Sequence, residues 1–323
     1  MLLSVIIVSY NTSQLTLQAV QSTLENVQKS KLLRTSCEII VVDNNSSDDT
    51  VLQLKEISHP ISIKILENKK NKGFGAANNQ AVGISQGEYI LFLNSDTIVQ
   101  NNALENLVKT FQHNPHDQTT ANLSSYQKVT DNLGIVAATL LNQDGSLQPQ
   151  GGDAPTLLSV ASQMLFLDDI PVLGKLLPST QHTGNNTRQK INATQLIQMG
   201  WVGGTAMMVS REVIDSIGLF DEAIFMYGED VEYCLRAQNH LFDVAVTPSA
   251  QIIHLGSRSS NTQTAIVGEM KGLQYLWSKH KPAWQTPFLK SILLLACLAR
   301  TLIYSTLGQR DTASIYKRLL SQL

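Results

Sequence analysis

The first hundred residues alternate between short apolar runs and longer segments in which apolar positions recur at helical spacing. Continuous apolar runs, many of them rich in β-branched residues, predict buried strands at 2–9, 38–42 and 88–93, and alternation of apolar and polar residues predicts a strand at 61–66. Helices are expected between and after them, at 13–29, 47–56, 76–85 and 101–113. Strands and helices that alternate at this spacing predict an α/β fold built on a doubly wound, mostly parallel sheet.

Polar side chains follow three of these strands, as YN at 10–11, DNN at 43–45 and NSD at 94–96. Ligands of doubly wound sheets bind beyond the carboxyl ends of the strands. We therefore expect these residues, together with the loop NKGFG at 71–75, to line a ligand site. The chain contains neither GxGxxG nor GxxxxGK[ST], so a nucleotide would be held in another way.

Beyond residue 113 the pattern is less regular. An Asn- and Gln-rich loop or insertion is expected at 114–132, and a long active-site flap, partly helical at 157–167, at 148–193. Further strands are expected at 135–141, 206–210, 242–246 and 250–253, with a turn at 142–146, a short helix at 212–217 and a helix from Glu229.

An acidic run within 201–236 is the strongest candidate for chemistry. It carries Asp221, Glu222, Glu229, Asp230 and Glu232 among apolar residues, and no Lys or Arg separates them between positions 211 and 236. Like charges in an apolar setting raise one another's pKa and cost stability, which a chain tolerates mainly where a base, a metal or a ligand uses them. Asp230 is the candidate general base. The alternative is a helix amino terminus enriched in acids because of its dipole, and this run alone does not separate the two.

His254 comes directly after the last predicted strand, and Gly256, Ser257 and Arg258 follow it closely. Flexible backbone, a hydroxyl and a guanidinium suit a diphosphate, so a ligand contact is favoured for this histidine. The alternative is a core histidine held by one backbone hydrogen bond.

Composition narrows the class of protein. The 323 residues are 43% hydrophobic and 15% charged, enough for a large core in one or two domains. A net charge of −2 gives no indication of a nucleic-acid partner. The three cysteines are far apart and odd in number, which argues against a disulfide framework and fits a reducing compartment. The first residues are interpreted as a strand, not a signal peptide, so a cytoplasmic location is expected.

The last 45 residues are basic, with seven Lys or Arg and one acid, about +6 by composition. They include an apolar segment at 288–307, interrupted by Lys290 and Arg300, whose uncharged run is too short to span a bilayer. Either a helix packed on the catalytic body or an interfacial helix on an anionic membrane would have this pattern, and the two can coexist. A membrane contact through 288–318 is therefore one of the two arrangements that the sequence predicts for this segment.

These segments together resemble family 2 glycosyltransferases, and within them the rhamnosyltransferase-like branch. The phrases that carry the resemblance, between residues 2 and about 260, are SVIIVSYN, IIVVDNNSSDDT, NKGFGAANNQ, LFLNSD, DGSLQ, WVGGTAMMVSRE, GLFDEAIFMYGEDVEYCLR and IIHLGSRS. The resemblance implies a GT-A fold, an inverting mechanism, a nucleotide-sugar donor such as a dTDP- or UDP-sugar, and Mg²⁺ or Mn²⁺. It also implies a glycan or lipid-linked acceptor.

The resemblance assigns a role to each matching residue. Ser9, Tyr10, Asn11 and Asp43 would hold the base and ribose, and Asn71, Lys72 and Gly73 would line the nucleotide. Asn94 and Asp96 occupy the DxD positions, with Asp96 and His254 expected at the metal. Trp201, Gly203, Gly204 and Glu229 would lie on the acceptor side, and Asp230 would be the base. The chain departs from the family pattern at Asn94, at Glu232, at Asn239-His240 and in the insertion at 114–132.

The expected organisation is a glycosyltransferase domain at 1–260, with a nucleotide-binding half at about 1–113 and an acceptor half at about 133–260, followed by a basic helical tail at 261–323. A sugar-nucleotide nucleotidyltransferase is one alternative, but it would need a basic, glycine-rich loop where this chain has SYNTSQ. A non-catalytic binding protein is another, but it would lack Asp230, Asp96 or His254, and all three are present.

Overall fold

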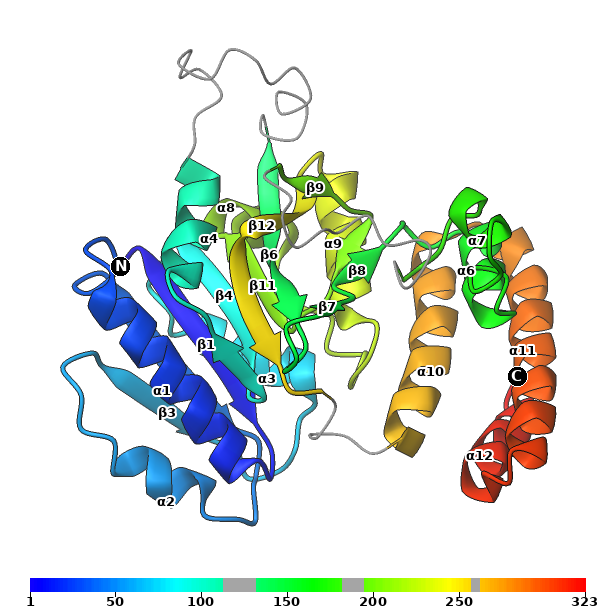
Figure 1. The fold of residues 1–323 in the computed structure, drawn as a ribbon, viewed down its shortest axis with the longest axis horizontal. Coiled ribbons are helices and arrows are strands. Elements are labelled where there is room, and N and C mark those ends of the chain that lie inside the picture. The colour runs from blue at the N-terminus through cyan, green and yellow to red at the C-terminus, as the bar shows by residue number, and fades with distance from the viewer. Residues whose placement is uncertain (113–131, 182–194, 257–261) are drawn as a thin grey trace.

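The computed structural model describes residues 1–112, 132–181, 195–256 and 262–323 (Figure 1). One half of its main sheet is parallel and consists of β1 (Leu3–Ser9), β2 (Cys37–Asp43), β3 (Ile63–Glu67) and β4 (Tyr89–Asn94). Every residue of β2 is buried, as the unbroken apolar run predicted, because helices cover both faces of the sheet.

The second half of the sheet contains β5 (Thr97–Val99), β6 (Leu133–Leu141), β11 (Ala206–Ser210) and β12 (Asp243–His254). The order across the sheet is β3-β2-β1-β4-β11-β6-β12-β5. β11 runs antiparallel to β4 and β6, β6 and β12 are parallel, and β5 is antiparallel to β12. The predicted α/β sheet is therefore confirmed as mixed and mostly parallel.

Short strands extend this frame towards the site. β7 (Leu147–Gln148) pairs with β6, and β9 (Ile197–Gln198) pairs with β12. A separate ribbon is formed by β8 (Gly151–Gly152) and β10 (Trp201–Val202), which are antiparallel.

Two layers of helices cover the sheet. α1 (Ser13–Lys29), α2 (Thr50–Lys55) and α4 (Ala103–Gln112) pack on the face that carries Val5 and Ile7. α3 (Phe74–Val82), α8 (Arg211–Ile217) and α9 (Glu229–Asn239) pack on the face that carries Ile6 and Ile40. The alternation of neighbouring β1 side chains between the two cores follows from the two-residue period of a strand.

Several predicted boundaries were wrong. The helix expected from Ser47 begins at Thr50, with Asp49 at the N-cap, because Asp48 accepts hydrogen bonds from Thr50 and the Ser13 backbone and orders the preceding turn. The two strands expected at 242–246 and 250–253 form one strand, β12, which stays paired with β6 across a register shift. The insertion expected at 114–132, apart from its last residue, lies outside the described residues.

The C-terminal part forms a third, helical layer. It contains α10 (Thr262–His280), the short 3₁₀ helix η3 (Ala283–Gln285), α11 (Thr286–Thr306) and α12 (Arg310–Leu320). Two helices from earlier in the chain, α6 (Leu157–Met164) and α7 (Leu173–Leu176), belong to the same layer. A separate core unites Met164, Leu235, Trp277, Leu293 and Tyr316. Figure 1 shows α10 between the sheet and the group formed by α6, α7, α11 and α12. Because Leu235 belongs to α9, this layer packs directly on the helix that carries the candidate base.

Candidate active site

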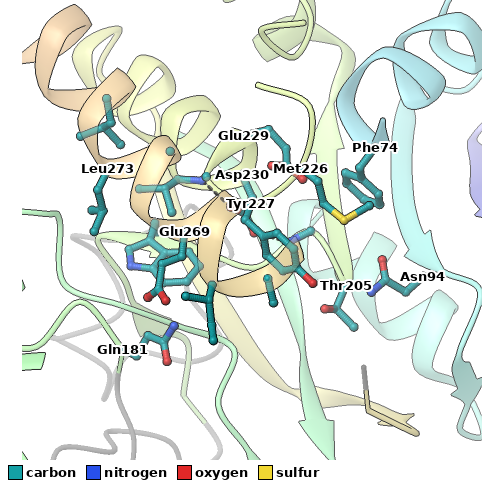
Figure 2. A pocket seen from close by; sticks show the side chains of 18 of the residues that line it. Phe74, Asn94, Gln181, Thr205, Met226, Tyr227, Glu229, Asp230, Glu269 and Leu273 are labelled. Carbon is teal, nitrogen blue, oxygen red and sulfur yellow. Dashed lines mark hydrogen bonds between the residues drawn. The ribbon is translucent and has the colours of Figure 1, made fainter. Parts of the chain in front are cut away.

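A cavity of about 430 Å³ lies where the carboxyl ends of β1 and β4 meet the first turn of α9 and one face of α10 (Figure 2). The predicted site residues that line it are Tyr10, Asn71, Asn94, Trp201, Gly204, Glu229 and Asp230. The predicted site residues outside this lining are Ser9, Asn11, Lys72, Gly73, Asp43, Asp96, Gly203 and His254. The fold thus brings together residues from both halves of the chain.

The loop at 71–73 is shaped by Asn44, which also lines the cavity. The Asn44 amide donates to Asn71 Oδ1 at 2.9 Å and to the Gly73 carbonyl at 3.1 Å, and its Oδ1 accepts from the Lys72 backbone N–H at 3.0 Å. Sequence reasoning placed Asn44 at a polar strand end but gave it no role. Its position between Asp43 and the loop shows that it holds the loop against the end of β2.

Gly73 connects this loop to the segment before α9. Its φ is +86°, and a Cβ there would lie 2.2 Å from the Phe225 carbonyl oxygen. The same carbonyl accepts a hydrogen bond from the Phe74 N–H at 3.0 Å. Only glycine can provide both this backbone conformation and this close approach.

Ser9 is fully buried, and its hydroxyl is 2.7 Å from the Thr16 hydroxyl, so it supports the start of α1. The neighbouring Tyr10 is 39% exposed and lines the cavity. Of these two residues, the structure therefore presents Tyr10 to a ligand.

Asn11 is exposed, and its Oδ1 accepts a hydrogen bond from the Ser47 N–H at 2.7 Å. Asp43 is almost fully buried, and its Oδ2 accepts from the Ser46 N–H at 3.0 Å. Its Oδ1 has no hydrogen-bond partner within the described ranges. A buried, unpaired acceptor is costly, and Asp43 Oδ1 is such an acceptor although Asp43 lies outside the cavity lining.

Asp96 and His254 meet because β5 pairs with the end of β12, where His254 lies opposite Thr97. The distance between His254 Nε2 and Asp96 Oδ1 is 3.3 Å. Asp96 is 1% exposed, and neither carboxylate oxygen has a hydrogen bond within the part of the chain that the structure describes. His254 Nδ1 lies 2.5 Å from Gln148 Oε1, which orients the ring so that Nε2 faces Asp96.

Asp230 lies in the first turn of α9, directly after Gly228 and Glu229. Its Oδ2 accepts a hydrogen bond from the Gly204 N–H at 3.1 Å, and its Oδ1 accepts from the Val231 N–H at 2.8 Å. Glu229 is 5% exposed, and its Oε2 has no partner among the described residues. The two adjacent carboxyls therefore have different environments.

Burial raises the pKa of Asp230 above its usual range, although the two backbone N–H groups oppose the shift. Burial and, second, the negative charge of Asp230 raise the pKa of Glu229 to about 8. Two carboxyls this close do not both ionise readily, and the hydrogen-bonded one takes the charge. Glu229 is therefore the carboxyl that keeps its proton, and Asp230, with two N–H donors, is the one on which a negative charge is better stabilised.

The predicted acceptor-side residues surround this carboxylate. The Trp201 indole N–H donates to the Thr180 carbonyl at 2.6 Å, which holds the ring at the cavity wall. The Gly203 N–H donates to the Gln150 carbonyl at 3.1 Å. A Cβ on Gly203 would lie 3.9 Å from Asp230 Oδ2, so the glycine leaves the base accessible.

The other acids of the 201–236 run are structural. Glu232 is fully buried and contacts Arg236, Lys279 and His280, each at 2.9 Å. Asp221 pairs with Lys279, and Lys279 with its hydrogen bonds holds the pKa of Asp221 at about 2 despite partial burial. Two of these partners, Lys279 and His280, come from α10, far along the chain, so the sequence around the acids could not reveal them.

The site prediction missed the contribution of α10. Its cavity-lining residues are Ala265, Ile266, Glu269, Gly272, Leu273 and Leu276. A Cβ on Gly272 would lie 2.4 Å from the Tyr227 carbonyl oxygen, so the helix backbone approaches the loop before the base very closely. The one available signal was the pair of glycines at 268 and 272, spaced so that both lie on one side of a helix.

The fold is similar to solved glycosyltransferases. The mannosyltransferase PcManGT from Pyrobaculum calidifontis has a TM-score of 0.54 at 16% identity, over 99% of this chain and 75% of that chain. TarS 1–349 from S. aureus has a TM-score of 0.50 at 16% identity, over 100% of this chain and 92% of that chain. At these identities the likeness shows the fold alone, and it confirms the expected GT-A architecture.

Two curated relatives align with most of the chain. The "N-acetylglucosaminyl-diphospho-decaprenol L-rhamnosyltransferase" of Mycobacterium tuberculosis is 22% identical over 263 residues, 77% of each chain. The "Low-salt glycan biosynthesis hexosyltransferase" of Haloferax volcanii is 24% identical over 256 residues, 78% of this chain and 66% of the relative.

The family model described as "Glycosyl transferase family 2" matches residues 4–165, half of the chain. This match covers β1 to α6 and includes strand-end residues that line the cavity. The chain therefore belongs to glycosyltransferase family 2 and is a transferase enzyme.

Proposed function

We propose that this enzyme is an inverting glycosyltransferase that moves a hexosyl unit, rhamnose being the first candidate, from a dTDP- or UDP-sugar to a glycan or lipid-linked acceptor. The observation that carries the proposal is the half-buried Asp230 carboxyl, which accepts hydrogen bonds from the Gly204 and Val231 N–H groups in a cavity with strand-end residues on one side and α10 on the other. The names of similar proteins support it: one relative is a rhamnosyltransferase with a lipid-linked substrate. Solved neighbours are in complex with UDP-GlcNAc or with GDP-Man and Mn²⁺.

The chemistry needs one base. An acceptor hydroxyl oxygen attacks the anomeric carbon, its proton passes to Asp230, and the bond from that carbon to the diphosphate oxygen breaks as the nucleoside diphosphate leaves. A single displacement inverts the anomeric centre. Asp230 supplies general-base catalysis, and its raised pKa makes it a stronger base than an exposed aspartate. Glu229 stays protonated, so the pair differs from the two working carboxylates of glycoside hydrolases.

Asp96 and His254 fit a divalent cation. Two orphaned carboxylate oxygens and an imidazole nitrogen with a fixed tautomer form a ligand set for Mg²⁺ or Mn²⁺. Among the described residues no group of three or more metal-ligating side chains occurs, so these two would hold the ion together with non-protein ligands. The bound cation would neutralise charge on the departing diphosphate.

The charge of the cavity supports the same assignment. None of its described lining residues is Lys, Arg or His, whereas Glu229, Asp230 and Glu269 are acids. A diphosphate would therefore meet no protein cation in this lining, and a metal ion supplies the missing positive charge. The alternative of a nucleotidyltransferase is not favoured, because the family match is to glycosyltransferases and the loop after β1 lacks basic residues.

Asp230→Asn tests the function, with Asp215→Asn, the same change at an exposed site on α8, as the control. We expect turnover to fall by about 10²–10⁴-fold while nucleotide-sugar affinity stays the same, because the amide keeps the size and loses the basicity. The measurements are transfer or donor hydrolysis with a panel of UDP-, dTDP- and GDP-sugars, and donor binding by calorimetry. Turnover equal to wild type would remove Asp230 from the mechanism.

We also propose that the enzyme works at the cytoplasmic face of a membrane, where α11 contacts the lipid. By length and composition Ala283–Thr306 could cross a membrane, and 22% of its apolar window is buried. Leu289, Leu293 and Ala296 pack in the third core, which favours surface contact over spanning. The large exposed apolar side chains of α11 are Phe288, Leu294, Leu295, Leu298, Leu302 and Ile303.

Basic residues near this face add attraction to anionic lipid. Lys290, Arg310, Lys317 and Arg318 are exposed. Arg300 is not available, because its guanidinium stacks 4.3 Å from the centre of the Phe166 ring. The charge facing the membrane is therefore smaller than the composition of the tail indicated, and each remaining cation contributes about 1 kcal/mol.

Vesicle sedimentation tests this contact. Full-length protein should pellet with vesicles of phosphatidylcholine and phosphatidylglycerol and be released partly at high salt. Leu298→Asp together with Leu302→Asp should keep the protein in the supernatant without loss of donor binding. Equal sedimentation of wild type and the double variant would show that α11 serves packing only.

A further inference from the structure

The cavity contains a third carboxyl, Glu269 on α10, that the proposed reaction does not use. Figure 2 shows Glu269 and Gln181 towards one end of the cavity and Asn94 and Thr205 towards the other, with Asp230 between. Asn94 and Thr205 lie at the strand ends, where the donor would bind. Glu269 therefore belongs to the opposite end, which an acceptor would occupy.

Glu269 is held in place by a chain of hydrogen bonds from three other segments. Gln163 on α6 donates to Glu269 Oε1 at 3.3 Å, and the Thr180 hydroxyl donates to the Gln163 amide oxygen. The Trp201 indole in turn donates to the Thr180 carbonyl. Within the described ranges Gln163 is the only side chain that hydrogen-bonds this carboxyl. The Glu269 carboxyl therefore retains free acceptor capacity for a ligand.

Backbone packing fixes how far α10 lies from the base. A Cβ on Gly268 would lie 2.8 Å from the Met226 carbonyl oxygen, and one on Gly272 would lie 2.4 Å from the Tyr227 carbonyl oxygen. These two glycines flank Glu269 by one and three positions. The carboxyl is therefore set by a helix that packs closely against the loop preceding α9 and the candidate base, as a recognition group requires.

Placing a carboxyl here is costly. Burial raises the pKa of Glu269, and the Arg300 charge opposes the shift only in part. Arg300 itself is committed to the Phe166 and Tyr316 rings and to the Met164 carbonyl. A half-buried carboxyl with one amide partner indicates a binding role more than a stabilising one.

The surrounding side chains indicate what would bind. Trp201, Ile266, Leu273 and Leu276 give apolar surface beside the carboxyl and the amides of Gln163 and Gln181. Apolar walls with a few fixed polar groups suit a sugar ring, which has C–H faces and hydroxyl edges. We propose that Glu269 accepts hydrogen bonds from hydroxyls of an uncharged acceptor sugar and selects against acceptor sugars that carry a carboxylate. This proposal rests on the proposed transferase function.

The experiment uses two acceptor probes, octyl β-glucoside and octyl β-glucuronide, which differ only by a carboxylate at C6. The donor is the nucleotide sugar that wild type hydrolyses. Wild type should use the glucoside at least about 10-fold more efficiently, because the glucuronide would place its carboxylate among Glu269 and Asp230. Glu269→Ala should raise the KM for the glucoside by about 10- to 100-fold, the range for a lost hydrogen bond to a charged group.

Glu269→Gln keeps the size, removes the charge and should reduce the preference for the glucoside, although the Asp230 carboxyl remains. Neither substitution should change donor affinity or donor hydrolysis without acceptor. Lys271→Gln, at an exposed position of the same helix, is the matched control and should behave as wild type. If Glu269→Ala does not fold, Glu269→Gln still tests the charge preference.

Two groups of results distinguish a failure of the proposed transferase function from a failure of the inference about Glu269. Wild type that neither binds nor hydrolyses any nucleotide sugar would overturn the proposed function and this inference with it. Wild type that hydrolyses donor but uses neither probe, or that prefers the glucuronide, would overturn the inference alone. An unchanged acceptor preference in Glu269→Gln would do the same.

Discussion

The protonation of Glu229 leads to a quantitative prediction for Glu229→Gln. The pKa of Glu229 is about 8 in the folded protein, against an ordinary value of 4.5. At a pH between these two pKa values, the unfolded chain has released the Glu229 proton, whereas the folded protein still holds it. The free energy of unfolding of wild type therefore falls as pH rises through this window, and the decline ends once the folded protein also ionises.

The size of this loss of stability follows from the difference between the folded and unfolded pKa of Glu229. One pKa unit corresponds to about 1.4 kcal/mol, so the shift destabilises wild type by about 4–5 kcal/mol at the alkaline end. A typical domain unfolds with about 5–15 kcal/mol, so the effect is a large fraction of the total. Glu229→Gln cannot ionise and lacks this decline. The raised pKa of Asp230 acts on both proteins, so it cancels in the difference.

Urea unfolding at pH values from about 5 to about 9 measures the effect. The substituted protein and wild type should have similar stability at the acid end, and the substituted protein should be several kcal/mol more stable at the alkaline end. Glu212→Gln, at an exposed position of α8, is the control and should follow wild type. Parallel pH profiles for Glu229→Gln and wild type would mean that Glu229 is ionised in the folded protein, and the assignment of the single charge to Asp230 would be wrong.

Two further predictions concern the metal pair and the loop at 71–73. Asp96→Ala and His254→Ala should each weaken Mn²⁺-dependent thermal stabilisation by the nucleotide sugar, and the double variant should lose less than the sum; additive losses would place the two side chains at separate sites. Gly73→Ala should lower the free energy of unfolding by about 1–3 kcal/mol more than Gly145→Ala. Gly145 has a similar φ of +81° but no atom within 4 Å of an added Cβ, so equal losses would mean that the contact with Phe225 is not restrictive.

Much of the fold could be predicted because local sequence determines it. The apolar runs of β1, β2 and β4 are buried on both faces, and that environment selects continuous apolar residues. The polar strand ends marked the edge of the sheet where the cavity lies. The order and spacing of the motifs were sufficient to indicate the family. The acidic run and that resemblance predicted Asp230 as the general base.

Other parts of the site depend on contacts between residues far apart in the chain. The three-residue strand β5 is too short to show a period, yet its pairing with β12 brings Asp96 to His254. The acidic run gave no sign of which acids are neutralised, because Lys279 and His280 approach Glu232 only after α10 packs on α9. Glu269 belongs to no motif and was assigned to a tail.

The sequence by itself determined which segments form strands and helices, where the strands end, and which family the chain resembles, since periodicity and residue type act over a few neighbouring positions. Only the tertiary structure decided which carboxyls are buried or paired and which helix forms the far wall of the cavity. A pKa depends on burial and on charges within a few ångströms, and these come from whichever segment packs there. Here that segment is α10, whose glycines let it approach the base closely enough to complete the cavity.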